Sequence, residues 1–221
     1  MKILIIAPHM DDEALGCGGT ISRYVNEGHD VHVVFIAHRI YNHTFDNSTN
    51  EQERESALFA KEILGYQKAT FLDLNDERLD VCLQDIIIPL EKVVQNYSPE
   101  IVFLCHRGDN NQDHRAVFHA ARVVLRPSAT PYIKKVLCYE VPSSTEQSPP
   151  FSEDAFIPNV YIDIDKTLPK KIEAIKKYQR EGREFPHPRS YRAVEVLAYK
   201  RGTESGFIAA EAFILYRERC D

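Results

Sequence analysis

The chain has 221 residues, of which 43% are hydrophobic and 27% are charged, and its net charge is −6 at pH 7. This length suits one domain with a substantial core, and the composition is close to the globular average, which excludes disorder, collagen-like repeats and coiled coil as whole-chain descriptions. The negative charge argues against a general nucleic-acid-binding protein, which would need a clustered basic surface.

The start of the chain predicts a strand–helix–strand unit. Residues 3–7 are a short apolar run typical of a buried strand, and a helical pattern follows over residues 11–26. Gly28 is expected to end this helix, and residues 31–36 supply the second strand. Such a unit is typical of a parallel sheet with right-handed crossovers.

The middle of the chain continues this alternation. The expected helices cover residues 51–64, 85–97 and 116–125. Further buried strands are expected over residues 69–74 and 101–105. Polar loops are expected over residues 38–49 and 106–114. Gly65 is expected to end the first of the helices, because glycine readily adopts the conformation that follows a helix.

The last third contains a strand over residues 136–141 and an irregular stretch over residues 143–158, which could be a lid, a rim loop or an oligomer contact. The elements expected after it are an edge strand over 161–164, helices over 168–181 and 191–199, and a final strand over 212–216. The pairs Lys170-Lys171 and Lys176-Lys177 are interpreted as a solvated helix face. The sequence shows no internal repeat, so we expect a single doubly wound domain over residues 1–221, with a mainly parallel sheet flanked by helices.

The five cysteines are scattered and form no C-x-x-C pair, so the sequence indicates neither a thiolate zinc site nor a disulfide framework. A reducing compartment fits this usage. The apolar run at residues 3–7 is too short for a signal peptide. No later segment approaches the ~18 apolar residues of a membrane span. We therefore expect a cytoplasmic protein that does not insert into membranes.

Chemically reactive residues follow two of the predicted strands. The segment PHMDDE at residues 8–13 follows the first strand, and HRGDNNQDHR at residues 106–115 follows the strand at 101–105. Ligands of open α/β sheets bind outside the carboxyl ends of the strands. If these two strands are neighbours, their imidazoles and carboxylates meet in one crevice, as a hydrolytic zinc site requires.

His9 and Asp12 lie three residues apart across the strand-to-helix turn, so both side chains can face one point. Catalytic zinc takes three protein ligands and keeps a fourth position for water. Asp11 would then be free to act as general base. Each motif alone has a simpler interpretation, because acids at a helix start are commonly caps and a pair such as Asp113-His114 is commonly just exposed to solvent. Their joint occurrence at two strand ends favours a shared site.

Gly16-Cys17-Gly18-Gly19 is not the fingerprint of a dinucleotide-binding loop. It lacks the third glycine of that fingerprint, and it lies inside the predicted helix instead of before it. We expect these glycines to allow close packing of the helix against the sheet. An oxidoreductase is therefore disfavoured.

Residues 8–19, PHMDDEALGCGG, resemble the P-H-x-D-D-E-x-x-G-x-G-G signature of the LmbE-like, or PIG-L, zinc N-deacetylases. Residues 111–117, NQDHRAV, resemble the second motif of this family, commonly H-P-D-H-R-x-V. Weaker similarities are Arg54 with Leu64-Gly65, residues 71–76, and Arg201-Gly202 followed by AEAF at residues 210–213. The resemblance extends over nearly the whole chain.

The resemblance implies a Rossmann-like fold and one Zn²⁺ per chain held by His9, Asp12 and His114, with Asp11 as the base. It implies substrates of the N-acetylglucosamine type, whether glycoside, glycolipid, nucleotide sugar or thiol glycoside. Asp113 resembles the family acid beside the third ligand, and such a carboxylate would orient an imidazole.

The sequence departs from the family pattern at Asn111, where many members carry a histidine that is thought to polarise the carbonyl or protonate the amine. Asn111 can donate a hydrogen bond to an oxyanion, but it cannot act as the acid. His106, or His38 from another loop, is a candidate to replace that histidine, and Asp11 could serve both steps. The resemblance alone does not assign the general acid.

The sequence therefore predicts a zinc-dependent N-deacetylase acting on a small-molecule amino sugar. Arg54 and Asp76 are, by resemblance, candidates for sugar contacts. Two alternatives stay open: an amidase for larger sugar–thiol conjugates, with an open pocket shaped by residues 143–158, and a non-catalytic metal- or sugar-binding module. Asp11, which binding alone would not need, favours an enzyme. The sequence leaves open whether the chain forms a homo-oligomer.

Overall fold

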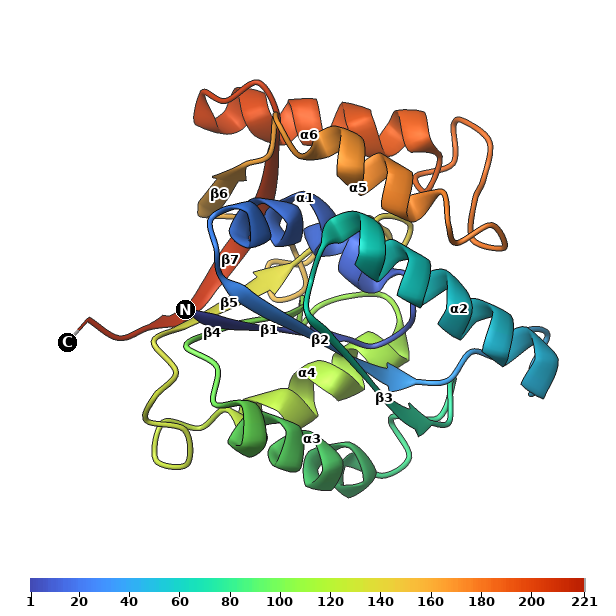
Figure 1. Cartoon of the computed structure of the whole chain (residues 1–221), viewed down its shortest axis with the longest axis vertical. Coiled ribbons are helices and arrows are strands. Elements are labelled where there is room, and N and C mark those ends of the chain that lie inside the picture. Colours follow the sequence, from blue (N-terminus) through green and yellow to red (C-terminus); the bar gives the residue numbers. More distant parts are fainter. Residues whose placement is uncertain (221) are drawn as a thin grey trace.

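Residues 1–220 are described by a computed structural model, in which a seven-stranded sheet lies between two layers of helices (Figure 1). The strands are β1 (Lys2–Ala7), β2 (Asp30–Ala37), β3 (Lys68–Leu74), β4 (Ile101–Cys105), β5 (Lys135–Tyr139), β6 (Val160–Asp163) and β7 (Ala210–Glu218). The α-helices are α1 (Asp12–Asn26), α2 (Asn47–Leu64), α3 (Leu83–Tyr97), α4 (Gln112–Val124), α5 (Leu168–Ile175) and α6 (Tyr191–Ser205).

The strand order is β3-β2-β1-β4-β5-β7-β6. Strands β1 to β5 pair in parallel, whereas β7 runs antiparallel to both β5 and β6. The prediction of a doubly wound, mainly parallel sheet flanked by helices is confirmed. Chain order reverses between β1 and β4, so the crevice expected for a ligand lies at the carboxyl ends of these two strands.

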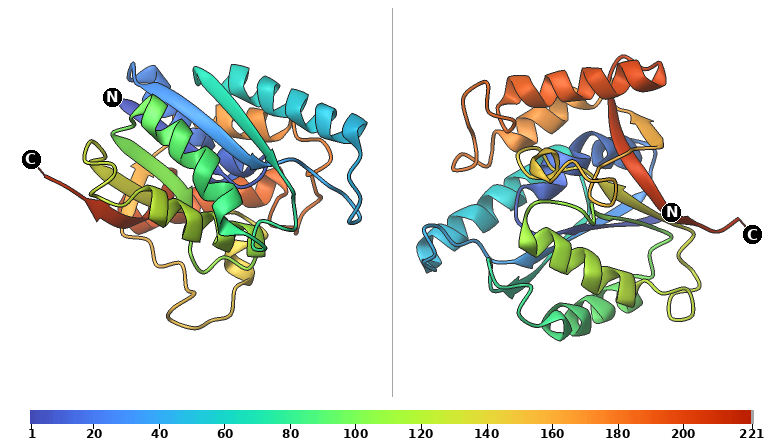
Figure 2. Two further views of the ribbon diagram at one scale, coloured as in Figure 1. Left: turned by 90° about the horizontal axis from the view of Figure 1, so that it is seen from below. Right: turned by 180° about the vertical axis from the view of Figure 1, so that it is seen from behind.

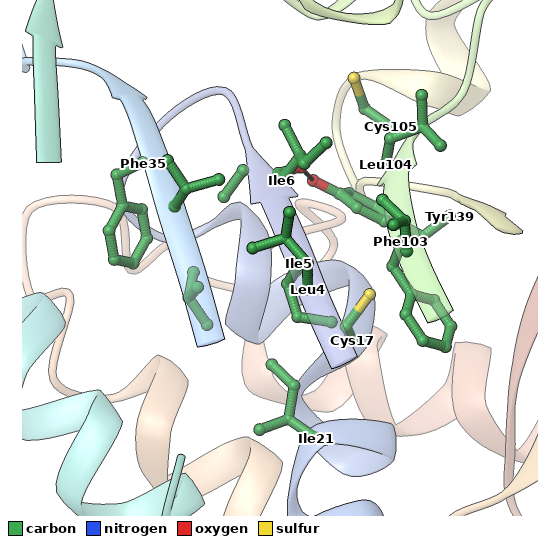
Figure 3. Close-up of a cluster of buried hydrophobic side chains, with 14 of the residues drawn as sticks. Leu4, Ile5, Ile6, Cys17, Ile21, Phe35, Phe103, Leu104, Cys105 and Tyr139 are labelled. Atoms are coloured by element: carbon green, nitrogen blue, oxygen red, sulfur yellow. Dashed lines mark hydrogen bonds between the residues drawn. The ribbon is translucent and has the colours of Figure 1, made fainter. Parts of the chain in front are cut away.

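Helices cover both faces of the sheet. α3 and α4 pack side by side on one face, and α1, α2 and α5 lie on the other with α6 beyond α5 (Figure 2). Both faces of β1 are therefore buried, and residues 3–7 have no exposed surface. Figure 3 shows Leu4, Ile5 and Ile6 of this strand among the buried side chains of neighbouring elements. This double burial explains the continuous apolar run, since central parallel strands have no solvent-facing side.

Two helices begin four residues earlier than their apolar patterns indicate. α2 begins at Asn47, because the side chain of Asp46 accepts a hydrogen bond of 2.7 Å from the backbone of Thr49 and caps the helix. α4 begins at Gln112 instead of residue 116, because Asn111 caps it by accepting from the Asp113 amide at 2.8 Å. Asp113 and His114 therefore lie in the first turn of a helix and not in a loop.

The two C-terminal helices also differ from the prediction. α5 ends at Ile175, six residues before the predicted end, whereas α6 continues to Ser205, where Gly206 adopts a φ of 79°. The predicted edge strand is confirmed as β6 at the end of the sheet. Within residues 143–158 the regular structure is one short 3₁₀ turn, Thr145–Gln147. No helix within residues 1–220 combines the length and the apolar character that a membrane crossing requires.

The glycines of α1 allow close packing, as the sequence predicts. A Cβ on Gly16 would lie 2.3 Å from the ring of Tyr139 on β5. A Cβ on Gly19 would lie 2.8 Å from Ile164, beyond β6. The glycines thus bring α1 against the sheet at one position and against the segment after β6 at another.

The expected solvated lysine face is wrong at Lys171, whose ammonium is buried against Glu211 of β7 at 2.5 Å. Lys171 also donates to the carbonyl of Leu15 at 2.7 Å, while Glu211 accepts from the amides of Gly19 and Thr20 at 3.0 and 2.7 Å. The pair joins α5 and β7 to the middle of α1. It therefore holds the helix whose first turn carries Asp12.

Replacing Lys171 by methionine is expected to lower the free energy of unfolding by about 3–5 kcal/mol, because the Glu211 carboxylate would stay buried without its cation. The double variant K171M/E211Q should recover much of this loss, since it removes both charges. Urea unfolding of both variants measures the effect, with exposed Lys170→Met as the matched control. Equal stabilities of K171M and K170M would contradict the importance of the pair.

Candidate active site

The loops that follow β1 and β4 meet at the carboxyl edge of the sheet. His9 Nδ1 lies 3.3 Å from His114 Nε2, and Asp12 Oδ2 lies 3.4 Å from the first nitrogen and 3.3 Å from the second. All three side chains are buried. The structure thus brings together three residues from two chain segments more than 100 positions apart.

The spacing of these three atoms fits a tetrahedral metal ion. Ligands about 2.0–2.1 Å from a zinc ion at tetrahedral angles lie about 3.3 Å from one another. Asp12 Oδ2 accepts a hydrogen bond of 2.9 Å from the His9 amide, whereas Oδ1 is buried and has no partner among the described residues, so one oxygen of this carboxylate is free for an ion. Two imidazoles and a carboxylate are typical donors for zinc. The residues present therefore fit such an ion.

The surrounding carboxylates favour a cation at this point. Burial alone would lower the pKa of His114, but Asp12 and Asp109 outweigh it and raise that pKa to about 9. The pKa of His9 is likewise raised against the effect of burial, by Asp113, Asp12 and Asp76. A metal ion would have to displace protons from these imidazoles, because only the neutral ring nitrogen binds metals.

A second pair of carboxylates holds the far side of the His9 ring. Its Nε2 lies 3.0 Å from Asp76 Oδ1 and 3.2 Å from Asp113 Oδ2. Asp113 is itself fixed by the amides of Glu77 and Leu79, at 2.7 and 3.1 Å. A proton on Nε2 shared with these acids leaves Nδ1 free to face Asp12. Asp76, a predicted sugar contact, thus lies buried against His9 while also bordering the cavity described below.

His9, Asp76 and Asp113 form an alternative group of ligand atoms. The oxygens of Asp113 in that group already accept two backbone hydrogen bonds. Asp12 instead retains an unpartnered oxygen. The first group is therefore the better candidate for a metal, and the second is better suited to orient the His9 ring.

Asp109 lies behind the His114 ring, with Oδ1 3.3 Å from Nδ1, within ion-pair distance but outside hydrogen-bond geometry. Its carboxylate accepts hydrogen bonds from the hydroxyls of Ser144 and Thr145 and, at 2.9 Å, from the amide of Asn111. Asp109 belongs to the reactive segment after β4, but its role could not be predicted from the sequence. These contacts also tie the irregular stretch over residues 143–158 to the site.

Asp11 stands beside the three candidate ligands with a backbone φ of 124°, at the N-cap of α1. Its Oδ2 pairs with Arg189 Nη1 at 3.0 Å, whereas Oδ1 is buried without a partner among the described residues. Burial raises the pKa of this carboxyl to about 7, although the charges of Arg189 and Arg39 oppose the shift. Asp11 can therefore exchange a proton near neutral pH, as a general base must.

Three charged residues near Asp11 could not be identified from the sequence: Arg39, Glu181 and Arg189. Glu181 accepts from Arg39 Nη2 at 2.6 Å, from Tyr41 Oη at 2.9 Å and from Arg189 Nη1 at 2.7 Å. Arg39 and Tyr41 lie in the loop after β2, and Glu181 and Arg189 lie between α5 and α6. None belongs to a recognisable motif, so only the folded chain shows that they adjoin the site.

A cavity of about 580 Å³ is bordered by Asp76, Asp113 and Arg189, which contact His9 and Asp11, and every side chain that lines it is polar. Its lining consists of His43, Asp76, Glu77, Asn110, Asn111, Gln112, Asp113, Ser143, Ser144 and Arg189. The side-chain oxygen of Asn111 accepts the capping hydrogen bond from Asp113, which leaves its amide group available as a donor. The cavity therefore offers many hydrogen-bond partners and little apolar surface.

His9, Asp11, Asp12 and His114 are buried and do not themselves line this cavity, and three further sequence-predicted residues do not line it either. Arg54 pairs with Asp73 and lies over the ring of Phe71, 4.5 Å from its centre. His106 Nε2 lies 2.9 Å from the backbone oxygen of Asp154. The ring of His38 packs against a neighbouring phenylalanine, at 4.5 Å between centres. The structure thus brings none of the three to the cavity wall, and the predicted roles of Arg54 and His106 have no support from its lining.

The chain is similar in sequence to a family of de-N-acetylases and to proteins named as deacetylases. Residues 4–125, more than half of the chain, match the family model described as PIG-L, GlcNAc-PI de-N-acetylase. The chain is 31% identical over 186 residues to the uncharacterized deacetylase YaiS of Escherichia coli K12, covering 80% of this chain and 90% of that protein. It is 26% identical over 192 residues to the diacetylchitobiose deacetylase of Thermococcus kodakarensis, covering 81% and 70%.

The fold is also that of a protein that is not named as a deacetylase. The crystal structure of GalB, the 4-carboxy-2-hydroxymuconate hydratase of Pseudomonas putida KT2440, matches with a TM-score of 0.79 at 22% identity, covering 100% of this chain and 98% of that one. This similarity concerns the fold alone. The reaction must therefore be argued from the site and from the sequence family.

Proposed function

The chain belongs to the PIG-L family of de-N-acetylases, and from this membership we propose that it removes the N-acetyl group of a small, hydrophilic amino sugar in a zinc-dependent reaction. The observation that carries the proposal is the convergence of His9 Nδ1, Asp12 Oδ2 and His114 Nε2 beside the half-paired carboxylate of Asp11. A metal site alone would not need that carboxylate. Hydrolysis needs it as a base.

His9, Asp12 and His114 would hold the ion, and Asp76, Asp113 and Asp109 would hold the two imidazoles in place. When bound, zinc supplies Lewis-acid chemistry that polarises water and an acyl carbonyl.

The remaining steps fall to the side chains of this chain. Asp11 Oδ1 takes a proton from the attacking water as the water oxygen bonds to the acyl carbon. The amide of Asn111, on the cavity wall, donates to the acyl oxygen as it gains negative charge. The bond between the acyl carbon and nitrogen then breaks, and Asp11 returns its proton to the departing amine. The products are acetate and the free amino sugar.

The lining of the cavity favours a compact sugar over a lipid or aromatic conjugate. Sugar hydroxyls can pair with its serine, asparagine and carboxylate groups, whereas an apolar aglycone would find no matching surface. Ser144 of the irregular stretch is held against Asp109, so this stretch closes one wall. These features support a mono- or disaccharide substrate over the larger sugar–thiol conjugate. The Thermococcus relative is named for a disaccharide substrate.

A panel of N-acetyl sugars tests the proposal. Zinc-loaded protein is incubated with N-acetylglucosamine, diacetylchitobiose, a nucleotide sugar, a glycolipid and a thiol glycoside, and released acetate and amine are measured. We expect the highest kcat/KM for the free mono- or disaccharide and loss of turnover after chelation. A protein that binds zinc but releases acetate from no member of the panel would instead be a binding module.

A further inference from the structure

Arg189 connects the C-terminal third of the chain to the candidate base. It lies between α5 and α6, immediately before Ser190, the N-cap of α6. Its Nη1 lies 3.0 Å from Asp11 Oδ2 and 2.7 Å from Glu181 Oε2, and its Nε donates to Ser143 Oγ at 2.6 Å. One guanidinium therefore joins three segments around the base.

The position of this guanidinium is fixed by the surrounding contacts. Only 17% of the Arg189 side chain is exposed, although it borders the cavity. Glu181, which receives it, is held in turn by Arg39 and Tyr41. The backbone of Arg189 also donates to His187 Nδ1 at 3.1 Å. A side chain held from several directions is suited to orient its partner, because its own rotamer cannot drift.

The two oxygens of Asp11 are in different environments as a result. Oδ2 accepts from Arg189, whereas Oδ1 is buried without a partner among the described residues. The backbone of Asp11 has a φ of 124°, a region that side-chain-bearing residues rarely adopt. Such a conformation persists where the surrounding structure enforces it, and it is common at functional sites. The local backbone and Arg189 together define where the carboxylate points.

We propose that Arg189 is a positioning residue for Asp11: by binding Oδ2 it fixes the carboxylate plane so that Oδ1 receives the proton of the attacking water. This inference rests on the proposed function, since a base has a role only in a reaction. It also extends the site beyond residue 125, where the match to the family model ends.

The forked shape of the guanidinium group is needed for this positioning role. Nε and Nη1 point to different partners at once, Ser143 on one side and Asp11 with Glu181 on the other. A lysine ammonium is a single point of charge on a flexible stem and cannot reproduce this fork. Lysine at position 189 would keep the charge but lose the fixed orientation. Arg189→Met, which removes the charge, and Arg189→Lys, which keeps it, therefore separate the effect of the charge from that of the fixed orientation.

Arg189→Met is expected to lower kcat by roughly 10²-fold, since misplacing a catalytic group by about 1 Å can cost that much. Zinc content should stay close to that of the wild type, and the loss should fall mainly on kcat, with a smaller change in KM because Arg189 borders the cavity. Arg189→Lys should be nearly as slow, and guanidinium ion should restore part of the kcat of Arg189→Ala. Arg183→Met, an exposed position of the same segment, is the matched control. A kcat for Arg189→Met equal to that of the control would overturn the proposal.

A readout independent of turnover is the orientation of Asp11 in crystals of the zinc-loaded wild type and Arg189→Met. We expect the carboxylate to bind Arg189 in the wild type and to rotate, or to occupy two orientations, in the variant. An unchanged carboxylate would refute positioning, and Arg189→Lys decides the point if the methionine variant does not fold. Absence of turnover by the wild type across the sugar panel would refute the proposed function separately.

Discussion

Replacing Asp11 by asparagine is expected to lower kcat by roughly 10²–10⁴-fold, the usual contribution of a general base. Asparagine has nearly the same shape and can still meet Arg189, but it cannot take a proton from water. Asp11 is not among the three candidate ligands, so zinc content should remain one ion per chain. The measurement is steady-state kcat beside zinc content determined by atomic emission.

Asp80→Asn is the matched control for this variant, because Asp80 is an exposed aspartate outside the cavity lining. It should retain both turnover and zinc. If Asp11→Asn turns over as fast as Asp80→Asn with normal zinc content, another group is the base. If Asp11→Asn loses zinc, Asp11 is needed for metal binding and its role as base is not separable.

Replacing His114 by alanine is expected to weaken zinc binding by more than about 100-fold, since even loss of a group that merely orients a ligand can cost 10–100-fold. Turnover should be lost with the metal. Zinc should also cease to raise the melting temperature, because ligand stabilisation follows the ratio of free ligand to Kd and is about 2.7 kcal/mol at 100 times Kd. Zinc titration followed by thermal unfolding measures both effects.

His119→Ala, an exposed histidine on the same helix, controls for loss of an imidazole from α4. It should bind zinc as the wild type does. Retention of wild-type zinc affinity by His114→Ala would show that the ion is held elsewhere. Loss of zinc by both variants would indicate damage to α4 instead of loss of a ligand.

The sheet could be predicted from the sequence because the physical signal is local. Residues 3–7 and 101–105 are continuous apolar runs, as strands buried on both faces must be, and both emerge as strands β1 and β4. Their adjacency, on which the predicted site was conditional, is shown by the parallel pairing of β1 with β4. It explains why the histidines after the two strands, His9 and His114, meet in one place.

The helix starts at α2 and α4 were predicted too late because capping residues resemble turn formers. Asp46 and Asn111 have short polar side chains that suit either role, and only their hydrogen bonds to Thr49 and Asp113 distinguish the two. Apolar periodicity carries no information about a polar first turn. The ends of the helices are therefore less predictable than their middles.

The surroundings of Asp11 could not be predicted because they depend on long-range contacts. Arg189 is 178 positions away in the chain, and Glu181 and Arg39 occupy segments without a motif. Asp76, a predicted sugar contact, borders the cavity, but its contact with His9 could not be predicted, since sequence similarity indicates that a residue matters without indicating what it touches. Buried charge pairs of this kind leave no periodic signal.

The most direct test of the metal site is anomalous diffraction at the zinc edge from crystals grown with zinc. We expect one strong peak per chain, about 2.0–2.2 Å from His9 Nδ1, an Asp12 carboxylate oxygen and His114 Nε2. A peak between His9 Nε2, Asp76 and Asp113, or one away from His114, would contradict it.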